Sequence, residues 1–328
     1  MRGLKVFGVV LLVFGAFFAG CFSRMVSMPG TSYAGPAVAA DAALEASLKV
    51  DVTQLAVGFG ERNLDNAPDA LERTATWLSE RLTTLGYVVK EEPYQVGERT
   101  VKNLIVEKAG TSRPTELIVI GAHYDTAHGT PGADDNGSGV GVGLALASYV
   151  MKQAPARTVR FVFFTNEEPP WFRHASMGSE VNARATRARG DDVKAMLSLE
   201  TMGYFTDEAN TQHYPWPFSI AYPSTGNFIA FVADTDSRDL ARECVRVFRE
   251  KAKVPSEGAS IPASVQGVDW SDHGPFWRQG YRALMVTDTA PNRNPHYHEA
   301  TDLPERVDFR RLALTTEGLF GVIDALAN

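Results

Sequence analysis

The stretch ELIVIGAHYDT, residues 116–126, joins an apolar run to a histidine and an aspartate. An apolar run without polar alternation is typical of a strand that is buried on both faces, as in the sheets of α/β proteins. Two other stretches have the same form and also reach acidic residues: TVRFVFFTNEE (residues 158–168) and VKAMLSLETMGYF (residues 193–205). The three stretches predict three buried strands with polar side chains at their ends.

Helical and strand patterns alternate along the rest of the chain. Apolar residues recur at spacings of three and four from Leu71 to Leu85, and Gly86 then ends this helix as a C-terminal cap. Further helices are predicted at 138–153, 237–253 and 308–327, and further strands at 87–96, 101–110 and 281–290. Strands that alternate with helices predict an α/β protein, and the sequence shows no second domain and no internal repeat.

The composition is that of an ordinary globular protein. Of the 328 residues, 44% are hydrophobic and 22% are charged, which is enough for a buried core. The formal net charge is -7 and no run is rich in Lys and Arg. We therefore expect no nucleic-acid partner.

The first 20 residues have the pattern of a secretory signal peptide, with a basic start, a short apolar run and small residues before Cys21. This cysteine resembles the lipidated cysteine of bacterial lipoproteins, although Phe18 stands where that motif usually has Leu. Residues 21–41, rich in Gly, Pro, Ser and Ala, are predicted to be a tether. We expect an extracytoplasmic protein held at the membrane by lipid on Cys21. A secreted or periplasmic protein without lipid, or an uncleaved signal anchor, stays open.

Polar residues follow the predicted strands, and the carboxyl ends of strands in such a sheet lie at one edge. They are His123, Asp125, Asp134, Asp135, Glu167, Glu168, Glu200, His296, His298 and Asp302. Taken alone, each motif is also typical of an ordinary turn or a solvated loop. Together, the carboxylates would repel one another unless a cation lay between them. Histidine and carboxylate ligands without cysteine suit Zn, Mn, Fe or Co at a catalytic site.

Six motifs carry a resemblance: HYDT (123–126), GADDNGSG (132–139), NEE (166–168), SLETMGYF (198–205), SDHGPF (271–276) and HYHEATD (296–302). In this order the sequence resembles, from about residue 45 onward, the secreted zinc exopeptidase family that includes bacterial leucyl aminopeptidase. Glutamate carboxypeptidase and glutaminyl cyclase are its relatives. The resemblance implies a three-layer α/β/α sandwich around a mixed, mostly parallel sheet, with the zinc peptidase domain at 42–328.

The resemblance also implies a site for two zinc ions per chain. His123 and Glu200 would hold one zinc, Glu168 and His298 would hold the other, and Asp135 would bridge them. The peptide bond after Asp135 would be cis.

Four further residues receive roles from the same resemblance. Glu167 would be the general base, and Asp125 would orient His123. Asp272 and His273 would hydrogen-bond near the substrate or act structurally. His296 competes with the family's zinc ligand two residues later, because HYH offers two imidazoles on one face of an extended segment.

The sequence departs from the family pattern at three places. Glu200 stands where the aminopeptidases more often have Asp, so a single zinc stays open as an alternative. PPWFRHASM, residues 169–177, lengthens the loop after Glu168 and begins with two prolines. Val268, Asp269 and Trp270 stand where some members have a disulfide and a tyrosine.

These implications point to a metal-dependent exopeptidase with a peptide substrate, and overall family likeness favours an aminopeptidase. The alternatives are a glutaminyl cyclase-like acyltransferase with one zinc, a carboxypeptidase or dipeptidase, a non-peptidase hydrolase, and a non-catalytic binding module. Aromatic residues near the motifs belong to the core or line the substrate pocket, and in the pocket they would favour an apolar terminal side chain. They are Trp171, Phe172, Tyr204, Phe205, Trp270, Phe276 and Tyr297.

Overall fold

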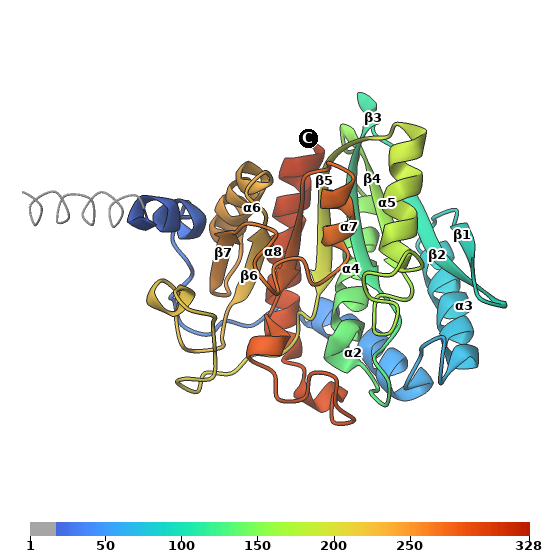
Figure 1. The fold of residues 1–328 in the computed structure, drawn as a ribbon, viewed down its shortest axis with the longest axis horizontal. Helices are drawn as coiled ribbons and strands as arrows, with labels where there is room; N and C mark the ends of the chain where they lie inside the picture. Colours follow the sequence, from blue (N-terminus) through green and yellow to red (C-terminus); the bar gives the residue numbers. More distant parts are fainter. Residues whose placement is uncertain (1–17) are drawn as a thin grey trace, which may run out of the picture.

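One twisted sheet of eight strands crosses the molecule in the order β1-β2-β4-β3-β5-β8-β6-β7 (Figure 1). The structure is a computed structural model that describes residues 18–328, so nearly all of the expected signal peptide lies outside the described residues. The strands are β1 (Lys90–Val96), β2 (Arg99–Lys108), β3 (Arg113–His123), β4 (Arg157–Phe164), β5 (Asp192–Glu200), β6 (Ile229–Ala233), β7 (Ser256–Ser260) and β8 (Ala283–Thr287).

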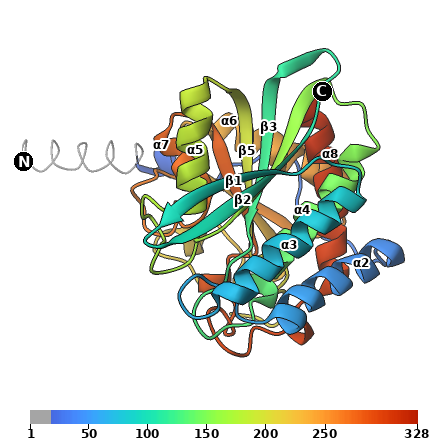
Figure 2. The same ribbon diagram turned by 90° about the vertical axis from the view of Figure 1, so that its right-hand side faces the viewer.

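Helices cover both faces of the sheet (Figure 2). One face carries α2 (Ala42–Thr53), α3 (Pro68–Thr84), α4 (Gly139–Met151), α6 (Arg238–Lys251) and α8 (Phe309–Ala327). The other face carries α5 (Gly178–Arg189) and α7 (His273–Arg278). The predicted three-layer α/β/α sandwich with a mixed sheet is confirmed.

The central strands of the sheet are covered on both faces, which explains their continuous apolar runs. In β3, Ile118 and Ile120 pack into the larger core, whereas Leu117 and Val119 pack against the opposite layer. Both faces of this strand are therefore buried. Strand β3 is parallel to β4 on one side and to β5 on the other. The carboxyl ends of all three strands consequently lie at the same edge.

Strands β6 and β7 were not predicted from the sequence. Strand β7 reads SEGAS and has no apolar period, and it lies at the end of the sheet. Strand β6 is parallel to β7 but antiparallel to β8, which makes this end of the sheet mixed. Beyond α7, two loops cover one face of β8, β6 and β7: residues 201–228 and residues 261–270.

The segment expected to be a tether lies along α6. Residues 18–26 are helical. Arg242 donates to the Ser27 carbonyl at 2.7 Å, and Arg249 donates to the Pro29 carbonyl at 3.1 Å. Among the residues that the structure describes, no helix has the length and apolar character to cross a membrane.

Candidate metal centre

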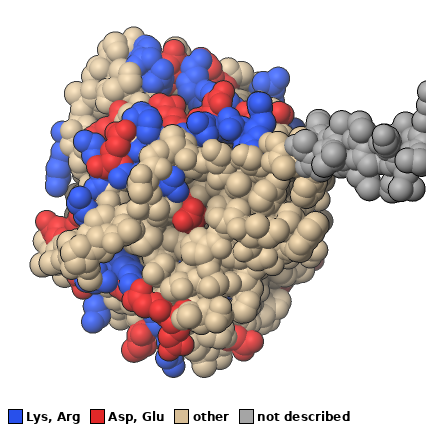
Figure 3. All heavy atoms as spheres, turned by 90° about the vertical axis from the view of Figure 1, so that its left-hand side faces the viewer, with Lys and Arg blue, Asp and Glu red and all other residues tan. Residues whose placement is uncertain are grey.

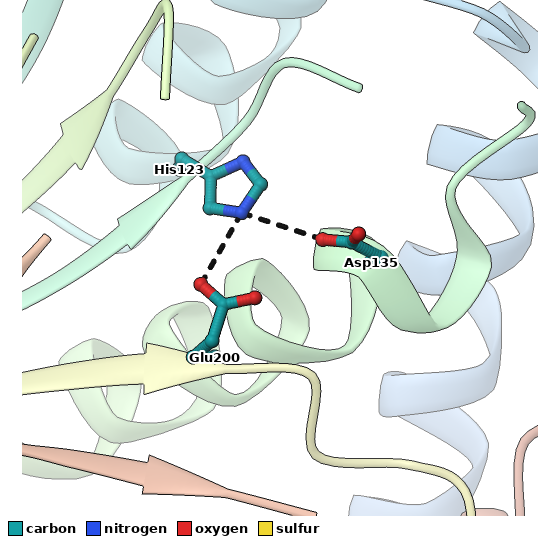
Figure 4. A group of neighbouring side chains, drawn as sticks. All are labelled: His123, Asp135 and Glu200. Carbon is teal, nitrogen blue, oxygen red and sulfur yellow. Dashed lines mark ion pairs between the residues drawn. The ribbon is translucent and has the colours of Figure 1, made fainter. Parts of the chain in front are cut away.

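Three side chains from separate elements meet at the carboxyl edge of the sheet (Figure 4). His123 ends β3, and Glu200 ends the neighbouring strand β5. His123 Nε2 lies 3.4 Å from Asp135 Oδ1 and 3.3 Å from Glu200 Oε2. All three residues are buried, and one ligand atom of each lies within 4.8 Å of the others. This group could hold one metal ion.

A second group shares Asp135 with the first. The other carboxylate oxygen, Asp135 Oδ2, lies 3.1 Å from His298 Nε2, which in turn lies 3.1 Å from Glu168 Oε2. Asp135 therefore stands between two imidazoles with one oxygen toward each. Glu167 lies beside the first group, with its Oε2 3.8 Å from His123 Nε2.

The turn that carries Asp135 follows β3 and leads into α4. The Asp135–Asn136 peptide bond is cis, as the family resemblance implied. Glu167 and Glu168 come directly after β4, and His298 lies in the loop between β8 and α8. Each cluster residue thus ends a strand or lies in the segment after one, which is why the strand pattern could place them at one edge.

The clustered atoms lack the partners that buried polar atoms need. Four buried atoms of the cluster have no hydrogen-bond partner: His123 Nε2, Asp135 Oδ2, Glu168 Oε1 and His298 Nε2. Burial raises the pKa of Glu168 to about 8, and the charge of Asp135 adds to this rise. A cation among these atoms would satisfy the free lone pairs and separate the carboxylate charges. The residues present therefore fit the predicted metal.

The pKa values of the two imidazoles also indicate that this site favours positive charge. Burial lowers the pKa of His298, but the carboxylates of Asp135 and Glu168 outweigh it and raise that pKa to about 10. For His123, burial likewise opposes protonation, and the charges of Glu200 and Glu167 raise its pKa well above the ordinary value. Both imidazoles therefore lie where the surrounding carboxylates favour a positive charge.

Comparison with known proteins decides the family. The model of peptidase family M28 matches residues 103–322, a range that contains every side chain of the cluster. The chain belongs to peptidase family M28. The uncharacterized protein YfbL of Escherichia coli K12 is 34% identical over 271 residues, which cover 80% of this chain and 82% of YfbL.

Other M28 relatives carry more specific names. A probable leucine aminopeptidase of Arthroderma otae is 26% identical over 239 residues, which cover 69% of this chain but only 57% of that protein. Among solved structures, LapB from Legionella pneumophila has a TM-score of 0.66 at 20% identity, covering 94% of this chain and 80% of LapB.

Two enzyme types share this M28 fold at similar scores. BSAP, a zinc aminopeptidase from Bacillus subtilis, has a TM-score of 0.64 at 14% identity, covering 84% of this chain and 94% of BSAP. The Porphyromonas gingivalis glutaminyl cyclase has a TM-score of 0.64 at 20% identity, covering 86% of this chain and 98% of the cyclase. Identities this low establish the fold alone. Together with the family match, they confirm the predicted enzyme class, a zinc metallopeptidase.

In this M28 site, the carboxylate of Asp125 accepts hydrogen bonds from two backbone N–H groups. Its Oδ1 accepts a hydrogen bond from the Glu167 N–H and its Oδ2 from the Glu168 N–H, each at 3.1 Å. His123 Nδ1 lies 3.2 Å from the Asp125 carbonyl oxygen and 3.5 Å from its Oδ1. Asp125 thus contacts the imidazole through its carbonyl oxygen and, at ion-pair distance, through its carboxylate, and the same carboxylate holds both glutamates.

Asp272 and His273, the other predicted supporting residues, do not bind the backbone of the two glutamates as Asp125 does. Asp272 is buried with both carboxylate oxygens free of hydrogen-bond partners, and burial raises its pKa to about 7. His273 bonds away from the cluster: its Nε2 lies 2.8 Å from the Val268 carbonyl, and its ring packs edge-on against Trp277 at 4.4 Å. His296 is outside the cluster too, since its Nδ1 contacts a threonine hydroxyl at 2.8 Å.

Two residues of the site had no predicted role. The Asp302 carboxylate accepts from the backbone N–H of Asp134 at 2.9 Å and of Asp135 at 3.1 Å. The Ser271 hydroxyl donates to Glu200 Oε2 at 2.7 Å. Both residues lie inside motifs that the sequence showed, HYHEATD and SDHGPF, so motif membership was the available signal. Their partners, however, are distant in sequence and could not be identified from it.

Proposed function

We propose that this M28 chain is an aminopeptidase that hydrolyses the N-terminal peptide bond at a site for two zinc ions. The observation that carries the proposal is the position of Asp135, whose two oxygens face two separate ligand groups. His123 and Glu200 would hold one zinc with Asp135, and Glu168 and His298 would hold the other. Bound zinc supplies an activated water and polarises the scissile carbonyl.

Glu167 is suited to move the proton of this reaction. It is buried beside His123 but belongs to neither ligand group that shares Asp135. Burial raises its pKa well above the ordinary value, which makes it a better base than an exposed carboxylate. Glu167 takes a proton from the attacking water and passes it to the amine nitrogen as the C–N bond breaks. A carboxylate whose lone pairs bind metal could not do this well.

A pocket next to the first ligand group supports a side-chain subsite. Glu200 lines this pocket, and so do Trp270 and Tyr297, two of the aromatic residues that the sequence left open between core and pocket. None of the described residues that line this pocket belongs to the longer loop after Glu168. Trp171 of this loop donates to Asp65 Oδ2 at 3.2 Å. The pocket indicates a large terminal side chain with apolar parts.

Glutaminyl cyclase activity is the second candidate, because a cyclase matches the fold as well as an aminopeptidase does. The complete pair of ligand groups favours the peptidase, since the cyclase alternative predicted a single zinc. A carboxypeptidase or dipeptidase would use the same residues on a different end of the peptide.

Metal analysis paired with a substrate panel tests the proposal. We expect two zinc ions per chain and release of the first residue from peptides with a free amino terminus. Blocking the C-terminus should leave cleavage intact, whereas N-acetylation should abolish it. Cleavage of N-acetylated peptides only, or cyclisation of N-terminal glutamine with one zinc per chain, would contradict it.

We also propose an extracytoplasmic location with lipid on Cys21. The described helix that contains Cys21 lies against the protein, where Phe22 packs on Phe218 at 5.8 Å between ring centroids. Labelling of the expressed protein with a radioactive fatty acid should mark the wild type and not Cys21→Ser. Equal labelling of both would contradict the proposal.

A further inference from the structure

A second carboxylate lies in the pocket beside the metal centre and has no part in the proposed chemistry. The strand registers place Glu200, Thr287, Ala230 and Glu257 in one row across β5, β8, β6 and β7. Paired residues of neighbouring strands point to the same face, and strands lie about 4.8 Å apart. The Cα atoms of Glu200 and Glu257 therefore lie about 14 Å apart at the two ends of the row.

The pocket is a trough over this row, with a volume of about 510 Å³. Among the described residues, Glu200 and Glu257 are the only charged side chains that line it. Its walls come from the two loops that cover this end of the sheet and are mainly apolar and aromatic: Phe218, Tyr222, Ile261, Val265, Val268 and Trp270. Figure 3 shows this side of the molecule as a broad uncharged area with an isolated acidic side chain within it.

Glu257 keeps free acceptor positions in this trough. No hydrogen bond from another described residue reaches its carboxylate, and the wall hydroxyl of Tyr222 donates instead to the Gly258 carbonyl at 2.7 Å. Arg249 Nη2 lies 3.6 Å from Glu257 Oε2, beyond hydrogen-bond distance. The guanidinium of Arg249 is already used, because it donates to the carbonyls of Pro29, Gly30 and Ser256 at 2.9–3.1 Å.

The half-buried carboxylate of Glu257 has Arg249 at ion-pair distance but accepts no hydrogen bond from it, so it can accept hydrogen bonds from a cationic group of the ligand. The side chain of Glu257 is 24% exposed, so water solvates it only in part. A charge-assisted hydrogen bond in such a place is stronger than one between neutral groups. The apolar walls between Glu257 and the metal centre suit methylene groups. A long side chain with an apolar stem and a cationic head combines both features, as lysine and arginine do.

We propose that Glu257 selects the terminal residue of the substrate by binding the cationic head of a lysine or arginine side chain. The stem lies in the trough over Thr287 and Ala230 while the terminal peptide bond is held beside Glu200. This inference rests on the proposed aminopeptidase function. Short side chains leave Glu257 unpaired, and an acidic side chain would place a like charge beside it.

The test compares p-nitroanilides of lysine, arginine, norleucine and glutamate on the zinc-loaded full chain at mildly alkaline pH. Norleucine has the stem of lysine without the ammonium group. We expect kcat/KM for the lysine and arginine substrates to exceed that for norleucine by roughly tenfold to a hundredfold. Glu257→Gln should remove this advantage, so that the lysine and norleucine substrates are cleaved with similar kcat/KM. The control is Glu250→Gln, which alters an exposed glutamate paired with Arg246 on α6 and should change nothing.

Two results would overturn the inference: norleucine cleaved as fast as lysine by the wild type, or a lysine preference that survives in Glu257→Gln. The first comparison needs no variant, so it decides even if Glu257→Gln does not fold. Absence of cleavage of all four free-amine substrates by the zinc-loaded wild type would instead contradict the aminopeptidase proposal. Glu257→Lys adds a positive test, because it should favour the glutamate substrate over the lysine substrate.

Discussion

Asp125 holds the backbone of Glu167: its Oδ1 accepts the Glu167 N–H at 3.1 Å, and its Oδ2 accepts the next N–H at 3.1 Å. This carboxylate thereby fixes the two adjacent glutamates at the end of β4, where one is proposed to bind zinc and the other to carry the proton. A buried carboxylate that binds two N–H groups sets the backbone from which both side chains depart.

Asp125→Asn should weaken zinc binding by roughly ten- to a hundredfold, as losses of outer supporting groups do. Asparagine keeps one acceptor oxygen and turns its NH₂ toward the other N–H. Competition with a chromogenic chelator measures the affinity. The matched control is Asp65→Asn, which changes an exposed acceptor of the Trp171 indole and should keep wild-type affinity. Equal affinity for zinc in Asp125→Asn and the wild type would contradict this role.

Gly139 gives a second prediction, on the other side of the site. Its added Cβ would lie 2.3 Å from Asn136 Oδ1 and 2.6 Å from the Leu199 carbonyl. The Asn136 amide donates to that carbonyl at 2.8 Å, and its Oδ1 accepts from the Thr201 N–H at 3.1 Å, so Asn136 holds both neighbours of Glu200. Gly139→Ala should lower the free energy of unfolding by roughly 1–3 kcal/mol through overpacking and should weaken zinc binding.

Gly141→Ala is the control for this substitution. Gly141 lies on the same helix, and its added Cβ would meet Val52 Cγ2 at 3.4 Å, an ordinary contact. Alanine also favours the helix over glycine. Urea unfolding and the chelator competition should therefore show no loss in Gly141→Ala. A Gly139→Ala protein as stable and as tight a zinc binder as Gly141→Ala would contradict the prediction.

The sequence predicted the strands that carry the site because these strands are buried on both faces. The apolar runs before His123, Glu167 and Glu200 leave no alternation, and their ends mark the sheet edge. Strand β7 was missed because Ser256–Ser260 lies at the end of the sheet and has little apolar content. Glu257, which lies on this strand, was therefore not predicted as a candidate site residue.

The partners of the site residues could not be predicted, since they depend on contacts between distant segments. Asp302 binds backbone atoms 167 and 168 residues away, and Ser271 binds a carboxylate 71 residues away. His273 illustrates the opposite case. Its motif left open a place near the substrate and a structural role, and its ring is held by Val268 and Trp277.

Removal of the metal should make stability depend on pH. Burial raises the pKa of Glu168 to about 8, and nearby carboxylates raise that of His298 to about 10 despite its burial. The folded metal-free protein therefore binds more protons than the unfolded chain between about pH 5 and pH 9, so its stability falls as the pH rises. With zinc bound, the ligands are deprotonated throughout. Thermal unfolding should show a falling Tm for chelator-treated protein only; a flat Tm for that protein would contradict the cluster electrostatics.

Glu167→Gln tests the division of labour between the adjacent glutamates most directly. Zinc content and kcat should be measured on the same preparation, with Glu168→Gln as the matched comparison. The account predicts that Glu167→Gln keeps the zinc content of the wild type and loses roughly 10²–10⁴-fold in kcat, the range of general-base catalysis. It predicts that Glu168→Gln loses zinc as well as activity. Near-wild-type turnover by fully zinc-loaded Glu167→Gln would contradict the account.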